Sequence, residues 1–187
     1  SNDTRGPIPL VPDAHVTSGA VFAFEQLDFE RWSVLGGGRV DFRHLDADAN
    51  AVLRLPDQSR NDTQGSGDVG LVFRPVGRLS IAANVGRAWR APTLFELFAN
   101  GPRLGEARYE RGRADMKPEG GMAYDASARW QSQRFRTEVA GFANRINDFI
   151  FVTPTNDSIG GLRVYSHEQA NATLAGTETL VEAEVRP

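Results

Sequence analysis

Four arginines lie close together in the stretch 91–118, and their side chains are well suited to binding an anion. They are Arg103, Arg108, Arg111 and Arg113. Each guanidinium presents planar donors that can hold a carboxylate or a phosphate through two hydrogen bonds. Three acidic residues are interspersed among them, at Glu106, Glu110 and Asp115. The same stretch can therefore be a solvated loop of mixed charge, and we predict the four arginines as candidate ligand-binding residues.

Residues 65–70 spell Gly-Ser-Gly-Asp-Val-Gly, which is the glycine spacing of a nucleotide-binding loop. A dinucleotide site needs a strand before these glycines and a helix after them. Here the residues that follow have the pattern of a strand. We interpret the segment as the flexible start of a strand, and we expect no nucleotide or other cofactor.

The stretch 46–57 contains oxygen-bearing side chains at Asp46, Asp48, Asn50 and Asp57, which resemble the ligands of a calcium loop. Ala51 replaces the glycine needed for the sharp turn, and no helices flank the stretch. A solvated polar loop is the simpler interpretation, and the sequence leaves calcium binding open.

The histidines give no sign of a metal or catalytic site. His15, His44 and His167 lie on different predicted strands, without the spacing of metal ligands. Ser166 and His167 are neighbours, so in a strand their side chains point to opposite faces and cannot act as a pair. We predict no metal site, no catalytic residues and no enzyme activity.

Composition narrows the class of protein. The chain has 187 residues and a formal net charge of −3, which gives no reason to expect nucleic-acid binding. It has no cysteine, so no disulfide framework is expected. No run of 18 apolar residues exists, which excludes a transmembrane helix. The mean hydropathy of −0.39 is still compatible with barrel strands, which alternate polar and apolar residues.

Eight strands are predicted, in four hairpins. The pairs are 15–29 with 31–45, 65–75 with 78–90, 119–131 with 134–151, and 161–169 with 172–186. The connections within pairs are short, whereas those between pairs, at 46–64, 91–118 and 152–160, are long. Short turns at one end and long loops at the other are typical of outer-membrane barrels. We predict an all-β fold, an antiparallel up-and-down meander of about eight strands that forms part of a larger transmembrane β-barrel.

Most predicted strands alternate with a period of two. Val34 and Val40 share one face, and Arg39 and Asp41 share the other. The strand 134–151 breaks this pattern, because its aromatic residues fall on both parities, and we predict a β-bulge near residues 140–141. Pro92 is expected to end the strand before it near Ala91.

Residues 84–102 read NVGRAWRAPTLFELFANGP and carry the most specific motif of the chain. The part 86–102 resembles the strand-to-loop signature of TonB-dependent outer-membrane receptors. Four other segments are similar to motifs of that family, in the family's order, at 68–75, 116–119, 142–150 and 170–178. The resemblance therefore covers most of the chain beyond residue 64.

The resemblance implies that residues 1–187 are one partial domain, a piece of a 22-stranded receptor barrel without the plug domain or its TonB box. It implies residence in the outer membrane of a Gram-negative bacterium and import of a scarce nutrient, such as an iron–siderophore complex. The implied partners are the plug, the TonB energy-coupling system that acts through the plug, and outer-membrane lipid.

A soluble all-β binding or structural module is the alternative. A barrel enzyme would need a convergent catalytic pair, which we do not find. We expect the isolated fragment to remain an open sheet and to self-associate along its edges.

Overall fold

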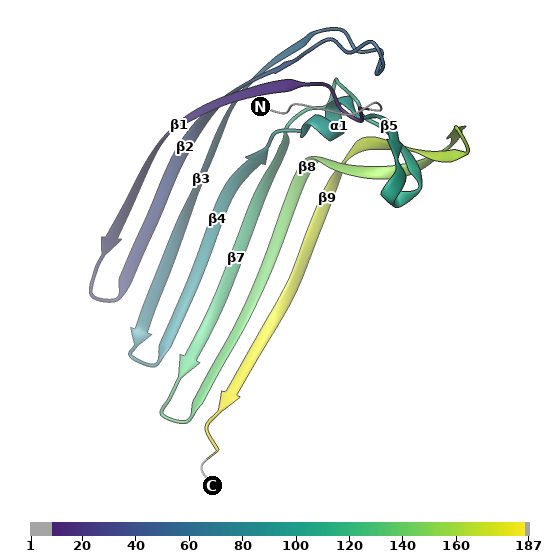
Figure 1. The fold of residues 1–187 in the computed structure, drawn as a ribbon. Helices are drawn as coiled ribbons and strands as arrows, with labels where there is room; N and C mark the ends of the chain where they lie inside the picture. The colour runs from purple at the N-terminus through teal and green to yellow at the C-terminus, as the bar shows by residue number, and fades with distance from the viewer. Residues whose placement is uncertain (1–8, 186–187) are drawn as a thin grey trace.

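Long antiparallel strands make up most of the molecule in the computed structural model, which describes residues 9–185. The long strands are β1 (Ala14–Asp28), β2 (Trp32–Ala47), β3 (Gln58–Val76), β4 (Leu79–Arg90), β7 (Glu119–Gln131), β8 (Phe135–Ile159) and β9 (Leu162–Ala183). The elements between β4 and β7 are α1 (Leu94–Phe98), β5 (Asn100–Arg103), a 3-10 turn (Leu104–Glu106) and β6 (Arg108–Arg111). Figure 1 shows the long strands side by side in a curled sheet. Within residues 9–185, no helix combines the length and apolar character that a bilayer crossing needs.

The strand order is β1-β2-β3-β4-β7-β8-β9-β6-β5, and the sheet does not close on itself. Short turns join β1 to β2, β3 to β4 and β7 to β8 at one end, while the connections 48–57 and 91–118 lie at the other (Figure 1). The predicted all-β meander and its open sheet are therefore confirmed. The expected loop 46–64 is shorter than predicted, because β3 already begins at Gln58 and places the glycine-rich residues 65–70 inside the strand and not at its start. β4 ends at Arg90, as Pro92 led us to expect.

The prediction for the last two long strands was wrong. Residues 152–160 were expected to form a loop and residues 170–171 a turn, but β8 runs to Ile159 and β9 continues unbroken from Leu162. The chain reverses at Gly160 and Gly161, whose φ angles of +59° and +79° suit glycine in a tight hairpin. Asn171 stays in the strand, and its side chain accepts a hydrogen bond from the Asp148 amide at 3.3 Å.

The predicted bulge near residues 140–141 was also wrong. β8 keeps a regular register with β9 through this region, and the register shifts later, between Ile146 and Phe149 and between Pro154 and Ser158. Phe142 keeps its place because it lies over Gly176, where a Cβ would come within 2.8 Å of the ring. An aromatic residue thus occupies the polar face because a glycine opposite makes room for it, without any change of strand parity.

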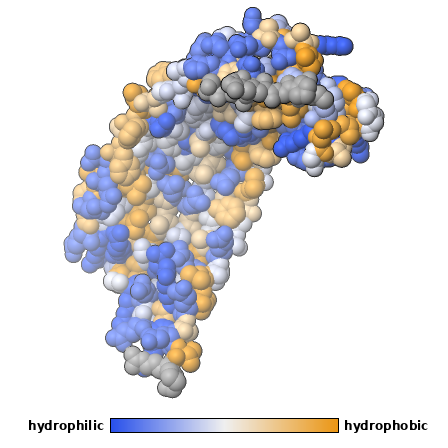
Figure 2. Space-filling view, in the orientation of Figure 1, coloured by the Kyte–Doolittle hydropathy of each residue, from blue (hydrophilic) through white to orange (hydrophobic). Residues whose placement is uncertain are grey.

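The register separates an apolar face from a polar one. One row across the sheet joins Val34, Leu71, Ala83 and Ala126. A row of the other parity joins Gly37, Asp68, Gly86, Ala123 and Asn144. Trp32 and Phe73 stack on the apolar face near the tight turns, with ring centroids 4.0 Å apart. Figure 2 shows hydrophilic side chains gathered around the loop end and around the turns, with hydrophobic and hydrophilic ones mixed along the strands between them. The predicted alternation is confirmed for these strands.

The packed core lies at the loop end and not along the strands. Its buried members are Ala14, Leu45, Ala47, Leu97, Phe98, Met116 and Ile150. They come from β1, β2 and β8 and from the 91–118 insertion, so this small core ties the insertion to the sheet. Along the strands, by contrast, apolar side chains such as Val69 and Val139 remain 55% and 50% exposed.

The close approach of β2 and β3 predicts a position-specific sensitivity to added side chains. A Cβ at Gly67 would lie 2.6 Å from the Gly37 carbonyl oxygen, whereas one at Gly65 has 3.9 Å to its nearest neighbour. We expect Gly67→Ala to lower the unfolding free energy by about 1–3 kcal/mol, because backbone must move. Gly65→Ala is the matched control and should be nearly neutral. Urea midpoints of the purified full-length protein measure both, and equal midpoints would contradict the prediction.

Candidate functional site

Arg90, the last residue of β4, holds two carboxylates at once. It donates to Glu96 at 2.8 and 3.0 Å and to Glu119 at 2.9 and 2.8 Å. Hydrogen bonds first to Glu119 and then to Glu96 raise the pKa of Arg90. Glu119 also accepts a hydrogen bond from the Ile150 amide. One guanidinium thus connects the end of β4 to the first turn of α1 and to the first residue of β7. Glu119 extends this connection to β8.

A capping motif a few residues after Arg90 starts helix α1. Thr93 is the N-cap of α1, and it exchanges hydrogen bonds with Glu96 in a capping box. Burial opposes the ionisation of Glu96, but hydrogen bonds from Arg90 and the Thr93 amide outweigh it and lower its pKa. The same carboxylate therefore caps the helix and binds the strand. This double role explains why arginine, threonine and glutamate occur together in residues 90–96.

Contacts on its other sides also fix the insertion. Arg60 of β3 donates to the Met116 carbonyl. The Gln169 side chain accepts from the Lys117 amide at 3.0 Å and donates to its carbonyl at 2.9 Å. A Cβ at Gly112 would come within 2.7 Å of the backbone of Leu97 and Phe98, so only glycine allows this approach. The insertion is consequently a folded unit and not an extended loop.

Its β5–β6 hairpin joins the sheet at the far edge. β5 pairs with β6 antiparallel, and β6 pairs with β9 in parallel, with Arg108 beside Arg163 and Arg111 beside Ser166. This parallel contact is the exception in a sheet whose other pairings are antiparallel. Figure 1 shows β5 and the loop end of β8 and β9 close together.

The structure brings two of the four predicted arginines together. Arg103 and Arg108 both donate to Glu110, at 3.0 and 2.9 Å, and both form ion pairs with Glu106 at 2.7 Å. Glu110 is only 1% exposed. Arg108 is shielded together with Glu110, at 19% exposed, whereas the Arg103 side chain is 44% exposed. Both arginines hold the hairpin together through Glu110.

The other two arginines have separate partners. Arg111 lies 3.7 Å from Asp157, and Arg113 lies 2.8 Å from Glu168 and 3.1 Å from Asp115. These pairs are solvent-exposed and therefore weak. An incoming anion could displace their carboxylates more readily than it could reach Arg108. Ligand binding by the four residues stays a prediction.

The candidate calcium loop uses its oxygens to shape itself. Asp57 accepts from the Ala49 amide at 2.7 Å, and Asn50 accepts from the amides of Val52 and Leu53. Among the described residues, no cluster of three or more acidic or histidine side chains could hold a metal ion.

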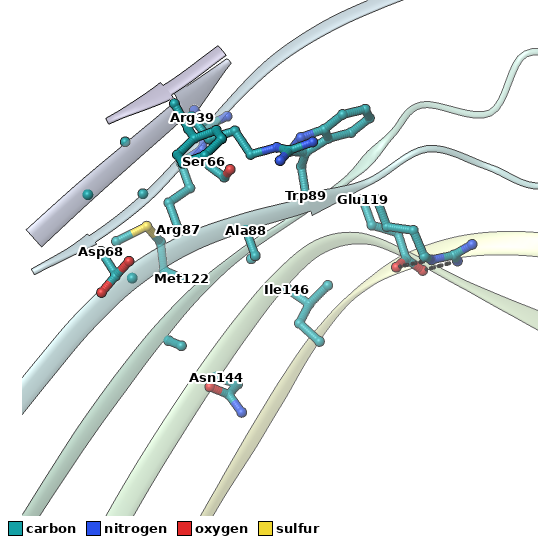
Figure 3. Close-up of a pocket in the computed structure, with 18 of the residues that line it drawn as sticks. Arg39, Ser66, Asp68, Arg87, Ala88, Trp89, Glu119, Met122, Asn144 and Ile146 are labelled. Atoms are coloured by element: carbon teal, nitrogen blue, oxygen red, sulfur yellow. Dashed lines mark hydrogen bonds and ion pairs between the residues drawn. The ribbon is translucent and has the colours of Figure 1, made fainter. Parts of the chain in front are cut away.

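A hollow of about 720 Å³ lies next to Arg90. Its lining includes Arg39, Asp68, Met122 and Asn144 from four different strands, together with Trp89 (Figure 3). Trp89 donates to Asp41 at 3.2 Å, which fixes the indole beside the hollow. The volume lies within the usual range for small-molecule sites, and the lining mixes apolar surface with convergent polar groups.

Reasoning from the sequence missed both the hollow and the joint role of Arg90, Glu96 and Glu119. The hollow depends on side chains brought together from separate strands, and no local pattern indicates it. The three charged residues all lie within recognised motifs, so the signal was present, but their mutual contacts were not visible from spacing.

A two-faced open sheet with long loops at one end and tight turns at the other has the architecture of an outer-membrane barrel wall. The family model for TonB-dependent receptor-like β-barrels matches residues 1–184, and the chain belongs to that family. This family is one of transport receptors and not of enzymes.

Solved structures share the fold at low sequence identity. The hemophore receptor HasR of Serratia marcescens, in complex with its hemophore HasA and heme, aligns with a TM-score of 0.77 at 17% identity, over 94% of this chain and 33% of that one. The copper transporter OprC aligns with a TM-score of 0.76 at 21% identity, over 93% and 28%. The FrpB iron transporter of Neisseria meningitidis aligns with a TM-score of 0.67 at 16% identity, over 94% and 24%. The chain thus spans about a third or less of each of these three proteins.

The geometry of Arg90 predicts that lysine cannot replace it. Lysine keeps the charge but cannot hold two carboxylates with planar, paired donors. We expect Arg90→Lys to weaken the docking of the insertion by about 1–2 kcal/mol, a value reduced for partial exposure. Limited trypsin digestion within residues 103–115 should therefore be faster.

The matched control is Arg129→Lys, because Arg129 binds Glu138 at 2.8 Å away from the insertion. Arg129→Lys makes the same chemical change as Arg90→Lys, and both variants keep a trypsin cleavage site at the substituted position. Digestion of Arg90→Lys at the wild-type rate would show that the double contact does not hold the insertion.

Proposed function

We propose that this chain forms part of the wall of a transmembrane β-barrel in the outer membrane of a Gram-negative bacterium, and that the complete protein imports a scarce nutrient. The observation that carries the proposal is the separation of the sheet into two faces. The row through Val34, Leu71 and Ala83 is suited to lipid, and the row through Asp68 and Asn144 is suited to a polar interior.

The apolar face has the features of a lipid contact. Its side chains are exposed in this chain, with Leu71 at 39% and Ile81 at 43%. Trp32 and Trp130 lie near the tight turns on this face, where an interfacial aromatic girdle belongs. A soluble module would instead cover this surface within its own fold.

For the ligand we propose an iron–siderophore complex or a comparable nutrient carrier. Anionic groups of such a ligand would meet Arg111 and Arg113, whose ion pairs are exposed and exchangeable. Arg103 and Arg108 would support the ligand surface by holding the hairpin. The hollow beside Trp89 is large enough to receive part of a small molecule.

For partners we propose a plug domain against the polar face and the TonB energy-coupling system acting through that plug. The polar row and the hollow provide hydrogen-bonding groups for such a contact. Self-association of the isolated fragment remains our prediction, because both edges of its sheet offer backbone groups for pairing.

Membrane residence and orientation are tested together by cysteine labelling in the full-length protein. Val52 is 67% and Leu104 75% exposed at the loop end, whereas Gly77 lies in the β3–β4 turn. An impermeant thiol reagent on whole cells should label Val52→Cys and Leu104→Cys but not Gly77→Cys, since long loops face outward. Labelling of Gly77→Cys alone would invert the topology, and recovery of the intact protein in the soluble periplasm would reject the barrel proposal.

Ligand contact by the loop arginines is tested by binding ferric catecholate and ferric hydroxamate complexes to the purified receptor. Replacing Arg111 and Arg113 together by glutamine should weaken binding of the preferred complex about tenfold or more, because charge-assisted hydrogen bonds are lost. Arg129→Gln is the control with the same change of charge per site. Unchanged affinity in the double variant would remove these arginines from the binding surface.

A further inference from the structure

Two arginines interrupt the apolar face of the sheet at one level. Arg87 of β4 is paired with Met122 of β7, and Met122 is paired with Arg145 of β8. Side chains an even number of residues apart on a regular strand share a face. Arg87 therefore lies on the face of Ala83. Arg145 lies on the face of Val139, so both arginines project from the surface that we assign to lipid.

These two residues are the charged side chains of an otherwise uncharged surface. From the tight turns up to their row, the apolar face of β4, β7, β8 and β9 is formed by alternate residues of Leu79–Arg87, Met122–Trp130, Phe135–Arg145 and Thr173–Ala183. Within these stretches, no acidic residue and no other basic residue lies on that face. Glu25, on the same face of β1, is separated from β4 by β2 and β3.

Neither arginine has a partner for its charge within the described part of the chain. Both residues are exposed, and no side-chain hydrogen bond or ion pair joins them to another residue between 9 and 185. Their row continues on β3 with Gly67, which has no side chain, and on β9 with Thr173, whose hydroxyl is neutral. The charges of Arg87 and Arg145 are thus left for a group outside this chain.

Arg87 and Met122 also border the hollow beside Trp89. Their neighbours Gly86 and Gly121 have no side chain to cover the backbone from the polar face. The strands themselves can therefore reach the hollow, while the alternation of the strand still directs the two side chains to the apolar face.

The height of this row follows from its distance to Trp130, which lies near the tight turns on the same face. Met122 lies eight positions before Trp130 on β7. Eight positions correspond to about 20 Å of height for a strand that rises about 3.3 Å per residue and is tilted by about 40°. The apolar band of an outer-membrane barrel is about 25 Å tall. The two arginines therefore lie at the loop-end boundary of the band, at the level of lipid headgroups.

We propose that Arg87 and Arg145 together bind the phosphate group of a lipid in the outer leaflet. One strand separates β4 from β8, so the two backbones lie about 10 Å apart, and arginine side chains that lean towards Met122 can meet at one phosphate. Guanidinium groups bind phosphate through paired, charge-assisted hydrogen bonds. Met122 lies between them, where its apolar side chain contacts the upper part of the acyl chains. The inference rests on the proposed function, because lipid reaches this face only in a membrane barrel.

The test measures lipid binding to the purified full-length receptor in neutral detergent by native mass spectrometry. The probe is a bisphosphorylated glucosamine lipid, and the matched lipid is the same molecule after removal of its phosphates. We expect Arg87→Gln with Arg145→Gln to weaken binding of the phosphorylated probe by about fivefold for each arginine, or about 25-fold together. Binding of the dephosphorylated lipid should be the same in this double variant and in the wild type.

A second pair of arginines supplies the matched control. Arg129→Gln with Arg136→Gln removes the same charge from the polar face, where Arg129 is paired with Glu138. This variant should bind the phosphorylated probe as the wild type does. Inorganic phosphate in large excess should leave the lipid complex intact, because it lacks the acyl chains that Met122 contacts. Urea midpoints confirm that both variants are folded before lipid is added.

Three results would overturn the proposal. The first is wild-type affinity for the phosphorylated probe in the folded variant of Arg87 and Arg145. The second is an equal loss in the polar-face control, which would mean a general effect of charge. The third is displacement of the lipid by inorganic phosphate, which would mean a site for free anions. Any of these in a receptor that resides in the outer membrane removes the lipid site alone, whereas recovery of the protein in the soluble periplasm removes the barrel as well.

Discussion

The contact of Arg90 with Glu96 and Glu119 is the interaction on which the loop end of the molecule depends. The two carboxylates are only 15% and 12% exposed, so each needs a partner for its charge. Arg90 serves both, and it sits where β4 leaves the sheet and β7 returns to it. The 91–118 insertion therefore has its two ends fastened at one point. The other contacts of the insertion depend on this attachment. They include the packing of Leu97 and Phe98 in the core and the pairing of β6 with β9.

The body of the sheet obeys a simpler constraint, and the sequence reveals it well. Alternation of side chains is local, so residues such as Val34 and Arg39 indicate their faces without knowledge of their neighbours. Pro92 likewise stops a strand by removing its own amide donor. For these reasons the faces of the long strands before residue 146 and the presence of long connections after β2 and β4 were predictable, although β3 begins at Gln58, seven residues before the predicted start. The family motifs agreed because they record the same local requirements.

The features that could not be predicted are those that depend on distant partners. Ala170 and Asn171 looked like a turn, but Asn171 is held in the strand opposite the irregularity at Asp148, whose φ is +55°. Phe142 lies on the polar face because Gly176 on the next strand leaves room for its ring. The arginines of the insertion suggested an open binding loop, and only the folded hairpin shows that Arg103 and Arg108 surround a buried carboxylate. The hollow beside Trp89 is a further product of tertiary contacts.

The position of β6 has a consequence for the edge of the sheet. An unpaired strand edge presents backbone donors and acceptors to any other strand. β6 satisfies the edge of β9 from Arg163 to Ser166, at the loop end. Within the described chain, the rest of β9 pairs on one side only, with β8. The stretch from Ala172 to Ala183 is thus the part of this edge to which further strands of a larger barrel can add, and such a strand must leave β9 before Ser166, which is already paired with the end of β6. The hairpin therefore marks the level at which continuous barrel wall gives way to separate loop structure.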